Sequence, residues 1–273
     1  IQASTEGFPK IAINKVGVRK MELPITLTHS TGGDFTTMAE LSSYCDLTED
    51  LKGINMSRIE RTLIPAFKKH GSITYLCEAA VRDLQEAHNT NHIYLKLRFK
   101  YPWVTKSPST ELESPETANI EVETRLNDGV LRQFVGVETV GMSLCPCSKE
   151  MSLLVNNLNE GEKKIFDGWK KNGNDLWPAM QSLVKKLEMA GFGAHNQKSF
   201  VNVKVEITKS IQFEEIINII NDSVSSKTFS VLKRPDEKYV TEVSYMSGYI
   251  NEKKELVELE GYGPKFVEDI VRQ

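Results

Sequence analysis

Two long stretches in which apolar and polar residues alternate meet at residues 127–129, which read Asn-Asp-Gly. The first stretch includes residues 120–124, and the second runs over Val130–Leu144. Alternation with a period of two is typical of a strand with one buried face, and Asn-Asp-Gly between two such strands favours a tight hairpin turn. The pair therefore predicts an antiparallel sheet, and its returning strand ends directly before Cys145.

The rest of the chain combines further alternating stretches with amphipathic helices. Alternation predicts a long hairpin over residues 10–47 that turns at Gly32 and Gly33, and further strands over 93–99 and 200–207. Apolar residues at helical spacing predict helices over residues 55–69, 72–88, 177–189, 210–224 and 264–273, and another that begins near Pro235. Residues 107–117 are rich in Ser, Pro, Thr and Glu and are predicted to form a loop. Together these elements predict an α+β fold.

The two halves of the chain have a similar order of elements. Each half combines paired strands with packed helices, without an obvious repeat in the sequence itself. We therefore expect two tandem modules, residues 1–128 and residues 129–273, because the length suits two modest domains. Residues 151–190 are expected to be a helical insertion in the second module.

The composition excludes several classes of protein. A net charge of −3 without a general basic bias gives no basis for nucleic-acid binding. No apolar run approaches the roughly 18 residues that a membrane span requires. Four scattered cysteines do not form the scaffold of a secreted disulfide-rich domain, so we expect a cytoplasmic protein. The first residue is Ile1 and not Met, which we interpret as the start of a trimmed chain.

Two of the cysteines, Cys145 and Cys147, are one residue apart, and His195 follows later in the chain. Thiolate and imidazole are the ligands that a borderline-soft divalent metal prefers. Pro146 fixes its own φ angle, and alternate residues of an extended strand face the same way, so both thiols are expected to line one pocket. One thiolate, the histidine and a carboxylate would leave a coordination position open, as a catalytic metal requires.

Other interpretations of the cysteine pair stay open. Both residues could be buried at a strand end as small apolar side chains, as free cysteines often are. They could also be a redox-active pair, although a structural disulfide at this spacing would be strained. Cys45 and Cys77 have no ligand-type neighbours in the sequence and are expected to be core residues.

Several blocks of the sequence resemble the type IB family of GTP cyclohydrolases. These blocks are Leu144–Glu150 (LCPCSKE), Gly193–Gln197 (GAHNQ), Leu232–Glu242 (LKRPDEKYVTE) and Pro264–Asp269 (PKFVED), and Gly53–Arg58 is similar to a fifth. The blocks are long and follow one another in order, so the resemblance covers nearly the whole chain.

The resemblance implies a tunnelling fold, in which two tandem modules each form an antiparallel sheet backed by helices. Copies of such chains assemble into barrels, typically a homotetramer with active sites at the subunit interfaces. The implied reaction converts GTP and water to 7,8-dihydroneopterin triphosphate and formate, with zinc as the metal and manganese or iron as alternatives. Whether the pterin product serves folate and tetrahydrofolate synthesis or modified nucleosides stays open.

The resemblance also implies roles for single residues. Cys145, His195 and Glu237 are implied as metal ligands, and Cys147 as a catalytic thiol, although the roles of the two cysteines could be exchanged. Water activated by the metal would attack C8 of GTP, with His195 and Glu268 also in the catalytic set. Glu268 would accept hydrogen bonds from N1–H and the exocyclic amine of guanine. Without the resemblance, Glu268 would be interpreted as a surface carboxylate.

A triphosphate requires cations, and four basic residues lie in or beside the blocks. These candidates for phosphate binding are Lys149, Lys198, Lys233 and Arg234. From the residues alone, each is equally a solvated surface charge.

The chain departs from the family pattern in three places. Residues 151–190 and 248–263 are expected to be insertions. The family also has a Glu and a His beyond the last block, whereas this sequence ends at Gln273, which we interpret as a second sign of trimming. Three alternatives therefore stay open: an archaeal-type cyclohydrolase with a cyclic phosphate product, a catalytically inactive metal-binding assembly protein, and a tunnelling-fold enzyme for another purine or pterin.

Overall fold

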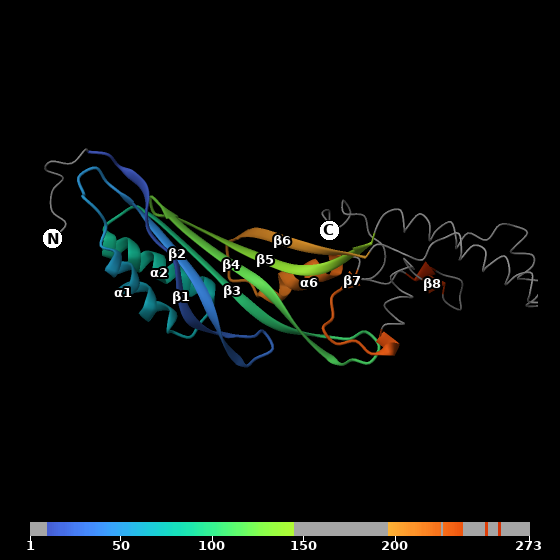
Figure 1. Ribbon diagram of the computed structural model, residues 1–273. Helices are drawn as coiled ribbons and strands as arrows, with labels where there is room; N and C mark the ends of the chain where they lie inside the picture. The colour runs from blue at the N-terminus through green and yellow to red at the C-terminus, as the bar shows by residue number, and fades with distance from the viewer. Residues whose placement is uncertain (1–9, 145–195, 225, 237–248, 251–255, 258–273) are drawn as a thin grey trace, which may run out of the picture. The chain divides into compact units, whose positions relative to one another are not determined.

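A computed structural model describes residues 10–144, 196–224, 226–236, 249–250 and 256–257 of the 273-residue chain (Figure 1). The strands are β1 (Ile13–Thr28), β2 (Asp34–Leu47), β3 (His92–Lys106), β4 (Glu113–Asn127), β5 (Val130–Leu144), β6 (Asn196–Ile207), β7 (Ser226–Lys227), β8 (Tyr249–Ile250) and β9 (Leu256–Val257). The helices are α1 (Met56–Phe67), α2 (Ile73–His88) and α6 (Phe213–Ser223).

The strands form one large sheet and one small sheet. The order in the large sheet is β1-β2-β3-β4-β5-β6, with β7 paired to β5, and β8 pairs with β9. Contacts between residues divide the chain into two compact units. One lies within Ile1–Val104, Pro115–Thr139 and Val201–Asn218, and the other lies within Thr105–Ser114, Val140–Phe200 and Ile219–Gln273. This grouping does not test the expected tandem modules, 1–128 and 129–273, which stay a prediction.

The first hairpin forms as the alternation predicts. The turn between β1 and β2 has φ +89° at Gly32 and +91° at Gly33, a region that suits glycine, and Thr28 pairs with Asp34 beyond it. Strand β1 has a register irregularity between Val18 and Met21, close to Gly17. This irregularity has the form of a β-bulge, which bends a strand.

The hairpin of β4 and β5 confirms the predicted turn at residues 127–129. Asp128 has φ +49° and Gly129 has φ +82°, and Asn127 pairs directly with Val130. The start of β4 corrects the predicted loop, which was expected to extend to Thr117 and instead ends before Glu113. Pairing with the long β3 draws this polar stretch into the sheet, because strand pairing overrides the weak local preference of Ser, Pro and Glu.

The helices lie against one face of the sheet (Figure 1), and they bury apolar side chains there. Their buried apolar residues include Ile59, Leu63, Phe67, Leu76, Ala80, Leu84, Phe213, Ile216, Ile217 and Ile220. On the strands, Leu41, Leu95, Leu97, Ile120, Val122, Val135 and Val137 are buried at alternate positions, so they share one face. The predicted α+β fold, an antiparallel sheet backed by helices, is therefore confirmed.

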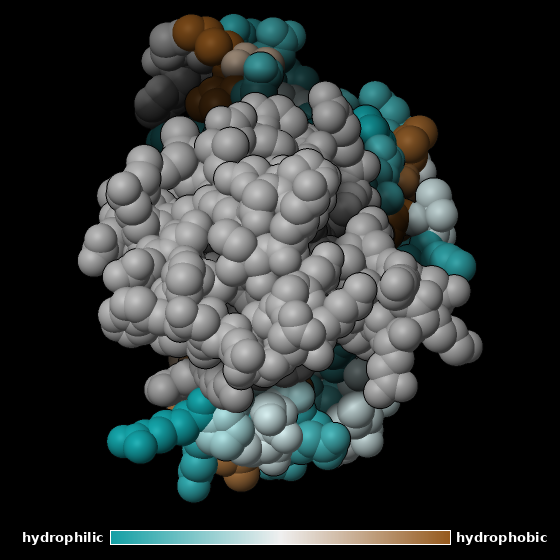
Figure 2. Space-filling view, turned by 90° about the vertical axis from the view of Figure 1, so that its right-hand side faces the viewer, coloured by the Kyte–Doolittle hydropathy of each residue, from teal (hydrophilic) through white to brown (hydrophobic). Residues whose placement is uncertain are grey.

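Among the residues placed by the structure, the surface carries both polar and apolar side chains. No helix in these ranges is long and apolar enough to cross a membrane. The coloured residues of Figure 2 are mainly hydrophilic, with hydrophobic ones in a few separate patches. Exposed apolar side chains that occur singly, such as Tyr75 and Phe200, are normal on proteins.

We predict that Gly17→Ala lowers the free energy of unfolding by about 2 kcal/mol or more. A Cβ atom at Gly17 would lie 1.9 Å from the carbonyl oxygen of Ser43, a backbone atom that cannot rotate away. Gly53→Ala is the matched control, since a Cβ atom there meets nothing within 4 Å. Urea denaturation of both variants measures the effect, and equal stability of the two would contradict it.

Candidate functional site

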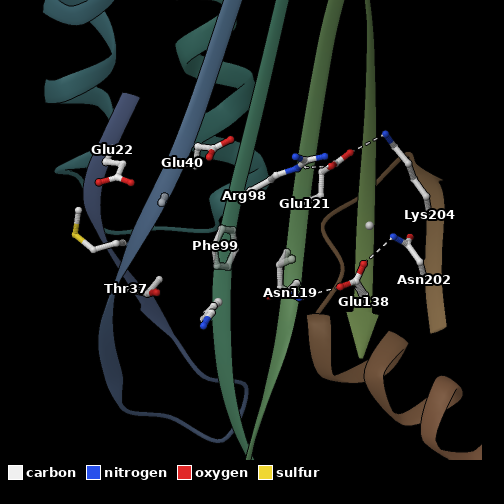
Figure 3. Close-up of a pocket in the computed structure, with 15 residues that line it drawn as sticks. Glu22, Thr37, Glu40, Arg98, Phe99, Asn119, Glu121, Glu138, Asn202 and Lys204 are labelled. Atoms are coloured by element: carbon white, nitrogen blue, oxygen red, sulfur yellow. Dashed lines mark hydrogen bonds and ion pairs between the residues drawn. The ribbon is translucent and has the colours of Figure 1, made fainter. Parts of the chain in front are cut away.

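A row of charged side chains crosses the polar face of the sheet (Figure 3). Glu22 on β1 is directly opposite Glu40 on β2, and Glu40 is directly opposite Arg98 on β3. Farther along, Glu121 on β4 is opposite Gly136 on β5. All five residues line a hollow of about 680 Å³.

The carboxylate of Glu121 is the centre of an ion-pair network in this row. Lys96 lies 2.7 Å from it, Arg98 donates to it at 2.8 Å, and Lys204 of β6 donates to it at 3.0 Å. Lys204 reaches β4 by passing over β5 at Gly136, where a Cβ atom would lie 3.9 Å from the Lys204 side chain. The absence of a side chain at Gly136 thus leaves room for this crossing.

A second carboxylate, that of Glu123, extends the network into the sheet. It is 2% exposed, and it forms ion pairs with Arg125 and Lys204. Burial of a charge is costly unless ion pairs and hydrogen bonds compensate for the lost hydration. The two cations supply that compensation, so the network fixes the side chains of β4 and β6 to one another.

The pKa values favour ionised carboxylates in the network. Burial alone would raise the pKa of Glu121, but hydrogen bonds from Lys96, Arg98 and Lys204 outweigh burial and lower it to about 2. The pKa of Glu123 is lowered in the same way. Carboxylates with such low pKa values cannot act as proton acceptors near neutral pH. We therefore interpret the network as structural.

The described lining of this hollow includes none of the three predicted site residues that the structure places. Of the predicted set, Lys198, Lys233 and Arg234 are placed by the structure, and all three are exposed. The Nζ atom of Lys198 lies 5.5 Å from the centre of the Phe200 ring, a cation–π contact. The other predicted site residues lie outside the described ranges: Cys145, Cys147, Lys149, His195, Glu237 and Glu268. The insertion predicted at 151–190 also lies outside them.

Among the residues with described positions, no three His, Cys, Asp or Glu side chains are grouped to hold a metal ion. The strands that lead to two of the predicted ligands are nevertheless neighbours. Strand β5 ends at Leu144, directly before Cys145, and β6 begins at Asn196, directly after His195. Near these ends, the hydroxyl oxygens of Ser143 and Ser199 are 2.8 Å apart.

The segment before the third predicted ligand is anchored by Asp236. This residue is 0% exposed, and each carboxylate oxygen accepts two hydrogen bonds. Oδ1 accepts from the backbone N–H groups of Ser109 (3.0 Å) and Thr110 (2.7 Å). Oδ2 accepts from the hydroxyl of Thr110 (2.6 Å) and the backbone N–H of Lys233 (2.9 Å). The next residue in the chain is Glu237.

Sequence analysis missed the role of Asp236. A short helical turn covers residues 234–236, close to the helix predicted to begin near Pro235. The bond from the Lys233 N–H back to Asp236 has the pattern of a capping box, in which an acidic side chain in the first turn accepts from the N-cap amide. That spacing could have indicated the local bond, but no sequence pattern indicated the partner loop near Ser109.

Serine and threonine side chains hold the preceding part of the same segment. Ser114 Oγ accepts hydrogen bonds from the backbone N–H groups of Ser230 (2.7 Å) and Val231 (3.1 Å). Farther back, Thr228 donates to the carbonyl oxygen of Val140 on β5 at 3.3 Å. The segment 226–236 is therefore attached by polar contacts along its length.

The remaining cysteines, Cys45 and Cys77, are free and buried, which confirms that they are core residues. Burial, with the nearby charge of Asp46, raises the pKa of the Cys45 thiol to about 11. Burial also raises the pKa of the Cys77 thiol. A thiol must ionise to act as a nucleophile or ligand, so these two residues do not provide reactive groups.

Comparison with known proteins identifies the family. The family described as type I GTP cyclohydrolase folE2 matches residues 1–248 of this chain. The chain belongs to this family. The resemblance seen in the sequence blocks is thereby confirmed. The match includes the positions of Cys145, Cys147, His195 and Glu237, while Glu268 follows it.

Curated relatives of the chain are named GTP cyclohydrolases. The GTP cyclohydrolase FolE2 of Dictyoglomus thermophilum is 28% identical over 266 residues, which cover 96% of this chain and 79% of the relative. That of Magnetococcus marinus is 26% identical over 269 residues, with 98% and 80% covered. The GTP cyclohydrolase MptA of Methanosarcina acetivorans is 29% identical over 291 residues, with 100% and 81% covered.

We predict that the ion pairs of Glu121 make the stability of this protein sensitive to acid. Its folded pKa of about 2 is below its ordinary value of 4.5, so its contribution to stability is present above pH 4.5 and is lost as the pH falls toward 2. Allowing for solvent screening, this contribution is about 1 to 2 kcal/mol.

Urea denaturation between pH 7 and pH 2.5 measures this contribution. Glu121→Gln should be less stable than the parent chain at pH 7, and the difference should shrink as the pH falls. Glu60→Gln, at an exposed position on α1, serves as the control. A difference that is independent of pH would show that Glu121 contributes through packing and not through its charge.

Proposed function

We propose that this protein is a metal-dependent GTP cyclohydrolase, which converts GTP and water to 7,8-dihydroneopterin triphosphate and formate. The observation that carries the proposal is the family match over residues 1–248. It is supported by relatives named GTP cyclohydrolase that are aligned with 96% or more of this chain.

Cys145, His195 and Glu237 are the proposed ligands of a divalent metal, with zinc first and manganese or iron as alternatives. A thiolate, an imidazole and a carboxylate form a donor set that suits such ions and leaves a coordination position open. A metal bound there would supply Lewis acidity, which lowers the pKa of water and activates it for attack at C8 of GTP. The neighbouring ends of β5 and β6 support the pairing of the first two ligands.

The other proposed residues bind the substrate or transfer protons. Cys147 is the proposed proton donor or acceptor during opening of the imidazole ring, with His195 also in the catalytic set. The carboxylate of Glu268 would accept hydrogen bonds from N1–H and the exocyclic amine of guanine, which together select guanine over adenine.

Basic residues are proposed to bind the triphosphate, whose negative charge needs several cations. These residues are Lys149, Lys198, Lys233 and Arg234. The exposure of Lys198, Lys233 and Arg234 supports this proposal, because a triphosphate could reach all three.

The proposed assembly is a homotetramer that builds tunnelling-fold barrels, with active sites at the subunit interfaces. The two tandem modules, 1–128 and 129–273, are part of the same proposal. An antiparallel sheet with helices on one face and a polar opposite face supports it, since a barrel of such sheets would enclose the polar face.

A second candidate is an archaeal-type reaction that stops at a cyclic phosphate. The observation that favours it is the similarity to MptA, which covers 100% of this chain. The two reactions share the opening of the guanine ring and differ in the fate of the phosphates.

Incubation of metal-free protein with GTP and Zn²⁺, Mn²⁺ or Fe²⁺ in separate reactions tests the proposal. We expect formate and a pterin that becomes fluorescent after oxidation, and mass spectrometry of the product should show three phosphates. A cyclic phosphate product would favour the archaeal-type reaction. Absence of formate with all three metals, from protein shown to be folded, would rule out both.

The two cysteines of the proposed site should respond differently to substitution. We predict that Cys147→Ala keeps the bound metal and loses turnover by at least about 100-fold, as expected for removal of a proton-transfer group. Cys145→Ala should lose the metal itself. Metal analysis and a GTP assay measure both effects, with Cys77→Ala, at a buried core cysteine, as the control. The reverse pattern would exchange the two roles.

A further inference from the structure

The loop between β3 and β4 has a conformation that binds a carboxylate. The N–H of Ser107 donates to the carbonyl oxygen of Leu112 at 2.9 Å, and the N–H of Leu112 donates to Ser107 Oγ at 3.0 Å. Glu111, with φ +54°, donates its N–H to the carbonyl oxygen of Ser107 at 3.1 Å. This closed loop leaves the N–H groups of Ser109 and Thr110 directed at one acceptor, and successive N–H groups of this kind form anion-binding concavities.

The occupant of this concavity is Asp236, which is 126 positions from Thr110 in the sequence. Its carboxylate is fully buried and receives four hydrogen bonds from neutral donors. Within the described part of the chain, no lysine or arginine forms an ion pair with it. The loop therefore takes the place of a cation, and it binds one specific side chain of the segment 226–236.

The residues that precede Asp236 lie at the surface. Lys233 and Arg234 are exposed, and so are the apolar residues Val231 (38%) and Leu232 (36%). Among the described residues, polar bonds hold this part of the segment at two places. These are the bonds from the Ser230 and Val231 amides to Ser114, and the bonds of Asp236 to the loop.

We propose that Asp236 is a positioning residue, which the Ser107–Leu112 loop holds so that Lys233 and Arg234 are presented to the triphosphate of GTP. This inference rests on the proposed function. Asp236 itself does not touch the substrate. Its bond to the Lys233 amide sets the backbone at the first of the two cations, and the loop fixes that backbone to the sheet.

The test compares binding of GTP with binding of guanosine, which has the same base and no phosphate. Asp236→Asn is nearly isosteric and keeps an acceptor for the Ser109 and Thr110 amides, but its NH₂ group cannot accept from the Lys233 amide. We expect calorimetry to show GTP binding weakened about tenfold and guanosine binding unchanged, because one hydrogen bond that orients a charged site is lost.

Three further variants separate positioning from general damage to the fold. Thr110→Val removes the hydroxyl bond to Asp236, and with it the hydrogen bond between the Thr110 and Ser107 hydroxyls, but leaves the charge of Asp236. It should weaken GTP binding in the same direction and less strongly. Glu111→Gln removes an exposed charge from the same loop and should bind GTP as the parent chain does. In Lys233→Ala/Arg234→Ala, addition of Asp236→Asn should cause no further loss, since residues that act through one another are not additive.

Hydrogen exchange reports on the loop independently of any ligand. The amides of Ser109, Thr110 and Lys233 should exchange slowly in the parent chain, and faster in Asp236→Asn. Unchanged GTP binding by Asp236→Asn, or an equal loss for GTP and guanosine, would overturn the proposal. Protected amides in a parent chain that neither binds nor converts GTP would instead overturn the proposed function, and with it the role assigned to Asp236.

Discussion

The buried carboxylate of Glu123 is the constraint on which much of the sheet depends. A charge that is 2% exposed requires partners, and Arg125 and Lys204 provide them. Lys204 belongs to β6, and it reaches β4 only by passing over β5 at Gly136. The last strand of the large sheet is thus joined to β4 by side chains as well as to β5 by its backbone. The strand that begins beside His195 is thereby held in register over its later part.

The local patterns predicted many of the elements that the structure describes, whereas the contacts between distant segments could not be predicted. The helices predicted over residues 177–189 and 264–273 lie outside the described residues. The turn at residues 127–129 and the alternation beyond it sufficed for the β4–β5 hairpin, because both signals are local. The start of β4 was missed, since Ser, Pro and Glu at 113–117 favour a loop until β3 pairs with them. Lys204 and Asp236 were missed for a related reason. Their partners lie 81 and 126 residues away in the sequence, and the periodicity of apolar residues does not indicate such pairs.

The candidate site, too, could be predicted from the sequence only in part. The type and spacing of Cys145, Cys147 and His195 indicated metal chemistry, and the family resemblance supplied the remaining roles and the substrate. The structure adds how these segments are held. Two strand ends are neighbours, and a short segment is bound to the Ser107–Leu112 loop through the buried Asp236 and to β4 through Ser114. A rigid scaffold that carries its functional groups on connecting segments is a common design in enzymes.

The position of Glu22 opposite Glu40 weakens the pairing of β1 with β2. Two carboxylates face one another where β1 meets β2, and like charges at directly opposite positions weaken a strand pair. Dissolved ions screen such repulsion, with a Debye length of roughly 10 Å at 0.1 M salt. This repulsion therefore weakens the pairing of β1 with β2 most in dilute buffer, and salt at physiological ionic strength reduces the effect.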